Sequence, residues 1–228
     1  VAEQAVFSWL QRKGFSCTVI SEEKGVSRLE GKNVDGYLIV DALDGTNNAV
    51  RGVPFSCVSL AAAEKPWLSS VYVGVVQDLW RDECFWAARG GGAFLNRREI
   101  HPSANVSLRT ALLGVDVNPP IPNRWVNGLI RLLRSAKHSR HLGANALELC
   151  YVACGRLEAF VELRGRSRVT DIAACQLILR EAGGFLVDEW GQPLEAPLDP
   201  SRQRLSFIAS GNREILNRIL RLLGIPAG

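Results

Sequence analysis

Short apolar runs alternate along this chain with segments whose apolar residues recur at helical spacing, and this alternation restricts the fold more than any other feature. The apolar runs predict strands at 15–20, 37–40, 55–63, 71–76, 84–88, 111–115, 157–163, 185–188 and 206–209. The helical spacing predicts helices at 2–13, 123–135, 144–154, 172–182 and 213–223. Strands that alternate with helices favour an α/β fold, in which helices cover the faces of the sheets.

A proline-rich stretch, residues 118–122, interrupts this pattern near the middle of the chain. Proline removes a backbone donor and breaks both helices and central strands, so this stretch is the best candidate for a boundary. We therefore expect an N-terminal α/β half, residues 1–118, and a C-terminal α/β half, residues 119–228. The two halves are expected to form one compact unit.

The composition is that of a globular protein with a sizeable core, since 47% of the 228 residues are hydrophobic and 22% are charged. No apolar run approaches the roughly 20 residues of a membrane span, and we expect a cytoplasmic protein with no membrane partner. The net charge of +4 fits an anionic small molecule or a solvated surface, and no aromatic-interleaved basic block indicates nucleic acid. The six cysteines form no C-x-x-C pair, so we expect reduced core cysteines rather than zinc or disulfides.

Acidic residues stand where predicted strands end. In the stretch VDALDGTNNAV, Asp41 and Asp44 come directly after an apolar run, and Glu22 follows another run in the same way. Strand ends of this kind converge on one edge of an α/β sheet, so these carboxylates are expected to lie together. Carboxylates packed together repel one another, and holding several in one place usually requires a cation.

Magnesium is the cation that this pattern favours, because hard cations take oxygen ligands and retain waters for a substrate phosphate. Gly45 allows a close backbone approach to an anion, and Thr46 adds a hydroxyl beside the metal. Amides at the start of a following helix would hold phosphate oxygens. The alternative is that Asp-x-x-Asp-Gly is a surface turn, in which both residue types are favoured.

Three separated segments resemble the motifs of the inositol monophosphatase family. The segment VDALDGTNNAVRGVPFSCVSLA is similar to the family's D-P-[ILV]-D-G-T-x-N with its following P-F and strand, and VISEEKG is similar to its G-E-E. The segment TDIAACQLILREAGGFLVDEWGQPL resembles the family's W-D-x-A-A followed by E-A-G-G. The motifs occur in family order, and the resemblance runs from about residue 1 to the last predicted helix. It implies a layered α/β sandwich of alternating helix and sheet layers, a homodimer, and a magnesium-dependent phosphatase.

The resemblance also implies a role for each matching residue. Thr46 matches the threonine that helps to activate the attacking water, and Glu23 orients a ligand or that water, unless it is only a solvated acid. An alternative role for Asp171 is to cap the helix 172–182, and this role is compatible with metal binding. The implied ligands of two or three Mg²⁺ ions, which Mn²⁺ can replace, are Glu22, Asp41, the carbonyl of Leu43, Asp44 and Asp171.

The sequence departs from the family pattern at two positions. Ala42 replaces the usual Pro, which loosens the loop, and Thr170 replaces a common Trp, which changes a wall of the substrate pocket. The chain also begins inside an expected helix, so the family's N-terminal helix pair and the acid that partners the catalytic threonine are expected to precede Val1. A module that binds metal and sugar phosphate without turnover is an alternative supported only by the missing acid and Ala42.

Basic residues in the second half of the chain are candidates for substrate binding. The stretch SRHLGAN resembles the family's substrate loop, and VELRGRSRVTD places Arg164, Arg166 and Arg168 within seven residues of Asp171. An arginine fork suits a second phosphate, although alternate arginines on a strand also face water. The predicted substrate-binding residues are Asp44, Gly45, Thr46, Arg140, Asn145 and Arg164.

The arginine pattern resembles archaeal-type members of the family, which hydrolyse both fructose-1,6-bisphosphate and inositol-1-phosphate. We expect the same two activities here. A phosphatase for adenosine 3',5'-bisphosphate is the neighbouring alternative, and a larger pocket with aromatic residues would favour it.

Overall fold

Two β-sheets form the framework of the protein, for which a computed structural model describes residues 2–31, 36–199, 201 and 204–226. The strands of the larger sheet are β1 (Cys17–Ser21), β2 (Gly25–Leu29), β3 (Tyr37–Asp44), β4 (Cys57–Ala63), β5 (Val71–Asp78), β6 (Cys84–Ala88), β7 (Ala93–Leu95) and β8 (Arg98–Glu99). They lie in the order β2-β1-β3-β4-β5-β6-β7-β8. Strands β1 and β3 are parallel, whereas the other neighbours in this sheet are antiparallel.

The smaller sheet comes from the second half of the chain. Its strands are β9 (Leu112–Asp116), β10 (His138–Arg140), β11 (Ala159–Ser167), β12 (Phe185–Val187) and β13 (Leu205–Ser210). They lie in the order β10-β9-β11-β13-β12, with β9 parallel to both of its neighbours. The domain boundary predicted after residue 118 stays a prediction, and β9, which precedes it, pairs within this second sheet.

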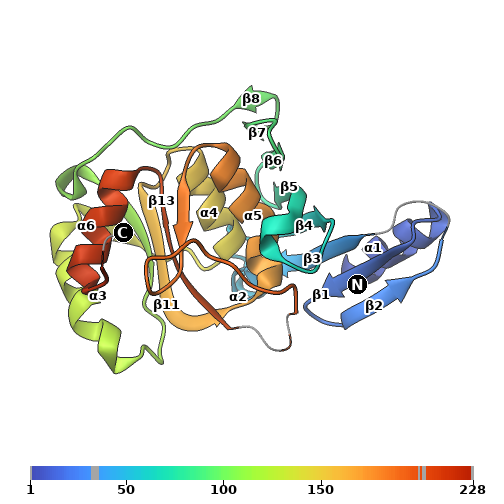
Figure 1. Ribbon diagram of the computed structural model, residues 1–228, viewed down its shortest axis with the longest axis horizontal. Helices are drawn as coiled ribbons and strands as arrows, with labels where there is room; N and C mark the ends of the chain where they lie inside the picture. Colours follow the sequence, from blue (N-terminus) through green and yellow to red (C-terminus); the bar gives the residue numbers. More distant parts are fainter. Residues whose placement is uncertain (1, 32–35, 200, 202–203, 227–228) are drawn as a thin grey trace.

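Helices separate and cover the two sheets. They are α1 (Ala2–Arg12), α2 (Thr46–Arg51), α3 (Asn123–Ser135), α4 (Asn145–Ala153), α5 (Val169–Glu181) and α6 (Arg213–Leu223). Helix α5 packs on β3 to β6, its neighbour α4 packs on β11 and β13, α6 packs on β13, and α1 packs on β3. Layers of helix and sheet therefore alternate, from α1 at one end to α3 and α6 at the other (Figure 1). No helix in the described part of the chain is long and apolar enough to cross a membrane.

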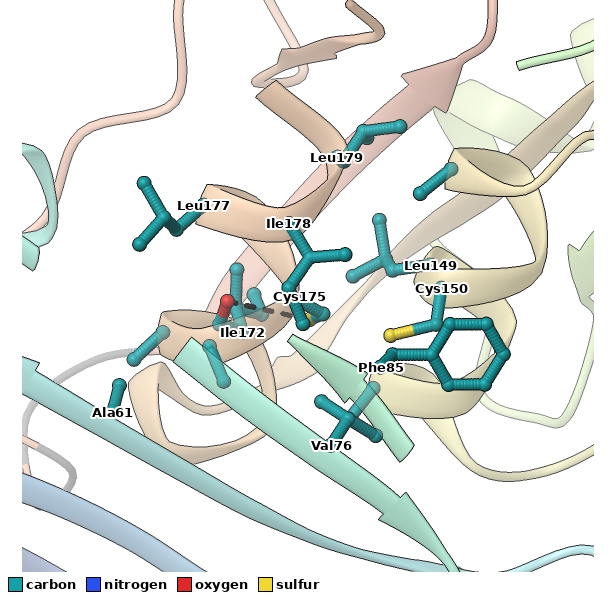
Figure 2. Close-up of a cluster of buried hydrophobic side chains, with 14 of the residues drawn as sticks. Ala61, Val76, Phe85, Leu149, Cys150, Ile172, Cys175, Leu177, Ile178 and Leu179 are labelled. Atoms are coloured by element: carbon teal, nitrogen blue, oxygen red, sulfur yellow. Dashed lines mark hydrogen bonds between the residues drawn. The ribbon is translucent and has the colours of Figure 1, made fainter. Parts of the chain in front are cut away.

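The amino-acid pattern of each helix explains its layer. Helices α3 and α6 are amphipathic, and they bury one face against the smaller sheet. Helices α4 and α5 are buried around most of their surface, as expected for a helix pair held between two sheets. Figure 2 shows the centre of that layer. The labelled side chains there are Ala61, Val76, Phe85, Leu149, Cys150, Ile172, Cys175, Leu177, Ile178 and Leu179. All six cysteines are free, and three of them, Cys57, Cys150 and Cys175, are fully buried.

The helices predicted at 123–135 and 213–223 and the strand predicted at 84–88 have the observed bounds. Strands β2 and β10 were not predicted, because β2 lies at a sheet edge and buries only Leu29, and β10 is exposed along its whole length. A helix was expected to follow Gly45 and Thr46, but no bounds were predicted for α2, since it is short and buries no residue. These elements lack the apolar periodicity on which the predictions rest.

Close contact between β5 and α5 generates a prediction about packing. A Cβ atom added at Gly74 would lie 2.6 Å from the carbonyl oxygen of Ala174 in α5, which is far inside van der Waals contact. Gly74→Ala should therefore lower the free energy of unfolding by about 1–3 kcal/mol, measured by urea denaturation. Val75→Ile adds one carbon on the opposite face of β5 and should change little. Equal stabilities of the Gly74→Ala variant and the wild type would contradict this packing.

Candidate active site

The parallel pairing of β1 with β3 brings the first two acids together. Ser21, the last residue of β1, pairs in register with Val40 of β3. Glu22 and Asp41 each follow one of these residues, so they leave the paired positions at the same edge of the sheet. Asp41 is 2% exposed, and its carboxylate accepts a hydrogen bond of 3.0 Å from the backbone N–H of Leu43.

A β-bulge places Asp44 on the same side of the sheet as Asp41. Asp41 pairs with Ser59 and Asp44 pairs with Cys57, so three steps along β3 match two steps along β4. In a regular strand, residues three apart face opposite sides, and the extra residue of the bulge cancels that reversal. The acids were predicted to follow the strand in a loop, but β3 extends through Asp44.

Gly45 and Thr46 connect β3 to α2 in a tight turn. Gly45 has a φ of +83°, and a Cβ there would lie 2.9 Å from the carbonyl oxygen of Phe55, so both conformation and space require glycine. The Thr46 hydroxyl donates a hydrogen bond of 3.0 Å to the carbonyl oxygen of Leu43. The turn therefore fixes a hydroxyl and a backbone carbonyl beside the acids.

Asp171 reaches the same place from the first turn of α5. The helix begins at Val169, earlier than predicted, and Arg168 is its N-cap. Asp171 is therefore the third helical residue rather than the N-cap, and its carboxylate caps the start of the helix from that position. It accepts hydrogen bonds from the Arg168 backbone N–H at 3.0 Å and from the Thr170 hydroxyl at 3.3 Å. Thr170 is thus a buried donor to Asp171.

Carboxylate oxygens of Glu22, Asp41 and Asp171 lie within 4.8 Å of one another. Two adjoining cavities of about 250 and 230 Å³ surround them and share Glu22, Asp41, Leu43 and Thr46. The acids that line the two cavities are Glu3, Glu22, Glu23, Asp41, Asp44 and Asp171. Only two basic residues, Arg166 and Arg168, line them among the described residues, and the Arg168 guanidinium pairs with Glu22. We call these two cavities together the acidic cleft.

The raised pKa values of these acids show that holding them together in ionised form costs free energy. Burial raises the pKa of Asp41 to about 7, and repulsion from Asp171 and then Glu23 adds to this effect. Burial also raises the pKa of Asp44, with repulsion from Asp41 and Asp171. The pKa of Asp171 is raised by burial as well, although the hydrogen bond from the Arg168 N–H opposes the shift. A bound cation would relieve this cost, since it favours the ionised carboxylates.

The donor atoms in the acidic cleft fit a hard divalent cation. Carboxylate and carbonyl oxygens are available from Glu22, Asp41, Leu43, Asp44 and Asp171, and the side chains that form this set offer no sulfur or imidazole ligand. Oxygen ligands of this kind are those that Mg²⁺ takes. The acids outnumber the arginines by six to two, so residues of the cleft do not balance their own charge.

The predicted substrate residues occupy different places. Asn145 begins α4 and donates a 2.9 Å hydrogen bond to Ser167, whereas Arg140 is exposed on β10 and its guanidinium bonds to the carbonyl of Ser139. Neither lines the acidic cleft, but Asn145 borders it, because its side chain also hydrogen-bonds Asp171 and its backbone N–H hydrogen-bonds Asp44.

Arg164 lies apart from Asp171. Its guanidinium pairs with Asp116 and, at 3.2 Å, with Glu162, and it lines a separate cavity of about 390 Å³. The pairing of β11 with β13 is irregular between Glu162 and Ser167, and Gly165 has a φ of +65°. Regular alternation therefore fails in this segment, and Arg166 is the residue that lines the cleft.

Two residues that the sequence reasoning did not select hold the loop between β10 and α4 in place. Glu148 of α4 is fully buried and accepts hydrogen bonds of 3.0 Å from the backbone N–H groups of both Leu142 and Gly143. Asn48 of α2 donates to the carbonyl oxygens of Leu142, at 2.6 Å, and Phe55, at 2.8 Å. Gly143 lines the acidic cleft, so this clamp fixes one wall of the site. The only sequence signal was that Asn48 lies in the D-G-T-x-N motif.

Asp44 is also tied to the loop. Its carboxylate accepts a 2.7 Å hydrogen bond from the backbone N–H of Ala146 in the first turn of α4. Glu3, from α1, was missed as well. It is 2% exposed, and its carboxylate oxygens have no hydrogen-bond partner among the described residues. Nothing in its sequence context distinguishes it from a polar residue of an amphipathic helix.

The alternating layers and the acidic cleft define a class of proteins that bind metal through clustered carboxylates at the edge of a sheet. Comparison with known proteins narrows this class. The model of the inositol monophosphatase family matches residues 1–224, and the chain belongs to that family of metal-dependent phosphatases. The predicted family and the predicted layered α/β fold are therefore confirmed.

Relatives match over nearly the whole chain. The fructose-1,6-bisphosphatase/inositol-1-monophosphatase of Methanothermobacter thermautotrophicus is 38% identical over 99% of this chain and 81% of its own length. The Nus factor SuhB of Xylella fastidiosa is 33% identical over 98% of this chain and 78% of its own length. The crystal structure of an inositol monophosphatase-fructose 1,6-bisphosphatase aligns with a TM-score of 0.83 and 29% identity, covering 96% of this chain and 81% of that one. SuhB from Bartonella henselae aligns with a TM-score of 0.81 and 32% identity, covering 97% and 81%.

The buried Glu148 generates a prediction about pH. Burial raises its pKa from an ordinary 4.5 to about 7. Between these values the unfolded chain has released a proton that the folded protein retains, so the folded state loses stability as pH rises. Glu148→Gln cannot ionise and keeps an acceptor for the two N–H groups. Its free energy of unfolding should rise relative to the wild type by up to about 3 kcal/mol across this range, measured by urea denaturation at several pH values.

The matched control for this experiment is Glu30→Gln, because the Glu30 side chain is 87% exposed. Its stability should follow the wild-type pH dependence. Parallel curves for the Glu148→Gln variant and the wild type would show that Glu148 does not carry the shifted proton.

Proposed function

We propose that this protein is a Mg²⁺-dependent phosphomonoesterase that hydrolyses fructose-1,6-bisphosphate and inositol-1-phosphate. The observation that carries the proposal is the convergence of the Glu22, Asp41 and Asp171 oxygens within 4.8 Å beside the Gly45–Thr46 turn. Family membership supports phosphatase chemistry, and the archaeal relative named for both activities supports the two substrates. We propose as metal ligands the predicted set Glu22, Asp41, the Leu43 carbonyl, Asp44 and Asp171.

Each residue of the acidic cleft has a separate proposed role in hydrolysis. A bound Mg²⁺ supplies positive charge that polarises the phosphoryl group and lowers the pKa of water. The Thr46 hydroxyl donates to the Leu43 carbonyl, so its oxygen remains an acceptor that can orient a water proton. Glu23 lines the adjoining cavity, where it can orient the same water. Gly45 lines the cleft, where phosphate oxygens can approach its backbone, and Arg166 and Arg168 line the same cleft and can neutralise phosphate charge.

A phosphate-release assay with Mg²⁺ tests the substrate assignment. Its arms are fructose-1,6-bisphosphate, inositol-1-phosphate and adenosine 3',5'-bisphosphate. We expect turnover of the first two, because no aromatic residue lines the acidic cleft within the described chain and an adenine ring would lack a stacking partner. Preferred turnover of the adenosine compound would replace our assignment, and binding without turnover of any of the three would support a non-catalytic module.

Removing one ligand charge should abolish catalysis. Asp44→Asn keeps an oxygen that can accept the 2.7 Å hydrogen bond from Ala146, so the fold should survive. Even residues behind metal ligands cost about 10- to 100-fold when mutated, and we expect this variant to lose more than about 100-fold in kcat. The exposed Asp82→Asn serves as the control, with wild-type rates in the same Mg²⁺ assay. Wild-type activity of the Asp44→Asn variant would remove Asp44 from the metal site.

Arg164 and Arg166 are the two candidates for contact with the second phosphate of fructose-1,6-bisphosphate, and their variants should behave differently. We propose that Arg166, which lines the cleft, contacts this second phosphate. Arg166→Ala should therefore reduce kcat/KM for the bisphosphate by about 10- to 100-fold. Inositol-1-phosphate has no second phosphate and should be affected much less.

We expect Arg164→Ala to behave differently from Arg166→Ala. In the structure Arg164 neutralises Asp116 and Glu162, so Arg164→Ala should lower thermal stability and affect both substrates alike. A selective loss of bisphosphate hydrolysis in the Arg164→Ala variant, with Arg166→Ala unchanged, would restore the assignment made from sequence spacing. Substrate contacts by Arg140 and Asn145, a homodimer and a cytoplasmic location also stay predictions.

A further inference from the structure

A second cleft is lined by residues along α6, in the last turn of α3 and in the short 3-10 helix Leu108–Thr110. Helices α3 and α6 lie at the far end of the molecule from α1 (Figure 1). The second cleft has a volume of about 860 Å³ and shares no lining residue with the acidic cleft. Its charged lining residues are Arg109, Arg134, Glu214, Arg218 and Arg221. We call it the arginine cleft.

Some of these arginines have partners within the protein. The Arg218 guanidinium pairs with Glu214 at 2.6 Å, one turn away on α6. The Arg221 Nε atom donates a 3.2 Å hydrogen bond to the carbonyl oxygen of Asn217. These contacts are of the ordinary kind found on the surface of a helix, and they explain Arg218 and Arg221 without any ligand.

Arg109 and Arg134 are different. Neither guanidinium makes a hydrogen bond or an ion pair within the described residues, although both side chains line the same cleft. Arg134 is in the last turn of α3, where the partial negative charge of the helix end favours a cation. Arg109 belongs to neither long helix, and the helix-end effect falls off within a turn. Four arginines against one glutamate leave a surplus of three positive charges that repel one another.

We propose that the arginine cleft is a second anion site, which binds a small molecule carrying two or more phosphate groups. Guanidinium groups present a planar fork that matches phosphate oxygens, and four of the nine residues that line this cleft are arginines. The volume lies within the range of small-molecule sites, roughly 300–1,000 Å³. The described lining residues include no aromatic ring, so the cleft offers no platform for stacked bases, which disfavours single-stranded nucleic acid.

Calorimetric titration with inorganic tripolyphosphate tests this proposal. The protein is first freed of divalent cations on a chelating resin, because the acidic cleft without metal repels phosphate and cannot contribute a signal. We expect one saturable site per chain. The double substitution Arg109→Gln with Arg134→Gln should weaken binding by about tenfold or more, since it removes two charge-assisted contacts. Both side chains are exposed, so this variant should keep the wild-type circular dichroism spectrum and Mg²⁺-dependent phosphatase rate.

The matched control is Arg97→Gln with Arg98→Gln, which removes the same charge from the exposed turn at β7 and β8. It should bind tripolyphosphate as the wild type does. No saturable binding by the wild type, or equal losses in both double variants, would overturn the proposal, because the second result indicates general charge attraction. Tighter binding of a single-stranded oligonucleotide than of tripolyphosphate, lost in the Arg109 and Arg134 variant, would overturn it in favour of a nucleic-acid surface.

Discussion

Mutual repulsion among Asp41, Asp44 and Asp171 is the constraint on which the rest of the site depends. The fold forces these carboxylates together through a bulge in β3 and the first turn of α5. Burial raises the pKa values of all three, and repulsion adds to the shifts at Asp41 and Asp44, which is a cost that the folded protein carries. A cation removes most of this cost and leaves a concentrated charge at the edge of the sheet. The same arrangement therefore accounts for both the strain of the site and its affinity for metal.

The buried layer of α4 and α5 gives the site its rigidity. The first turn of α5 carries Asp171, and the first turn of α4 donates a hydrogen bond to Asp44. Close contact of α5 with β5, at Gly74, ties that layer to the sheet that carries the other acids. Glu148 and Asn48 then hold the loop that includes Gly143 against the cleft. Residues far apart in the sequence are positioned by packing rather than by a flexible loop, as precise positioning of reacting groups requires.

The family and the layered fold could be predicted because three separated motifs of the sequence resemble those of the family. The grouping of the acids could also be predicted from the residues, because each acid stands directly beside a periodic apolar segment. Glu22 and Asp41 follow strands, and the parallel register of those strands could be expected in an α/β fold. The position of Arg164 could not be predicted in this way, since Gly165 and the irregular pairing of β11 break the period of two on which the prediction rested. Glu148 was missed for another reason. A polar residue in a helical pattern reads as solvent-facing, and only tertiary packing shows that it is buried.

Proton release on metal binding tests the central claim most directly. Mg²⁺ titrated into the protein at pH 7 should displace protons, because the pKa of Asp41 is about 7 and those of Asp44 and Asp171 are raised. Calorimetry in two buffers with different ionisation enthalpies measures this release. The account predicts saturable binding whose apparent enthalpy differs between the buffers in proportion to the protons released. An enthalpy that is the same in both buffers, or the absence of saturable binding, would contradict it.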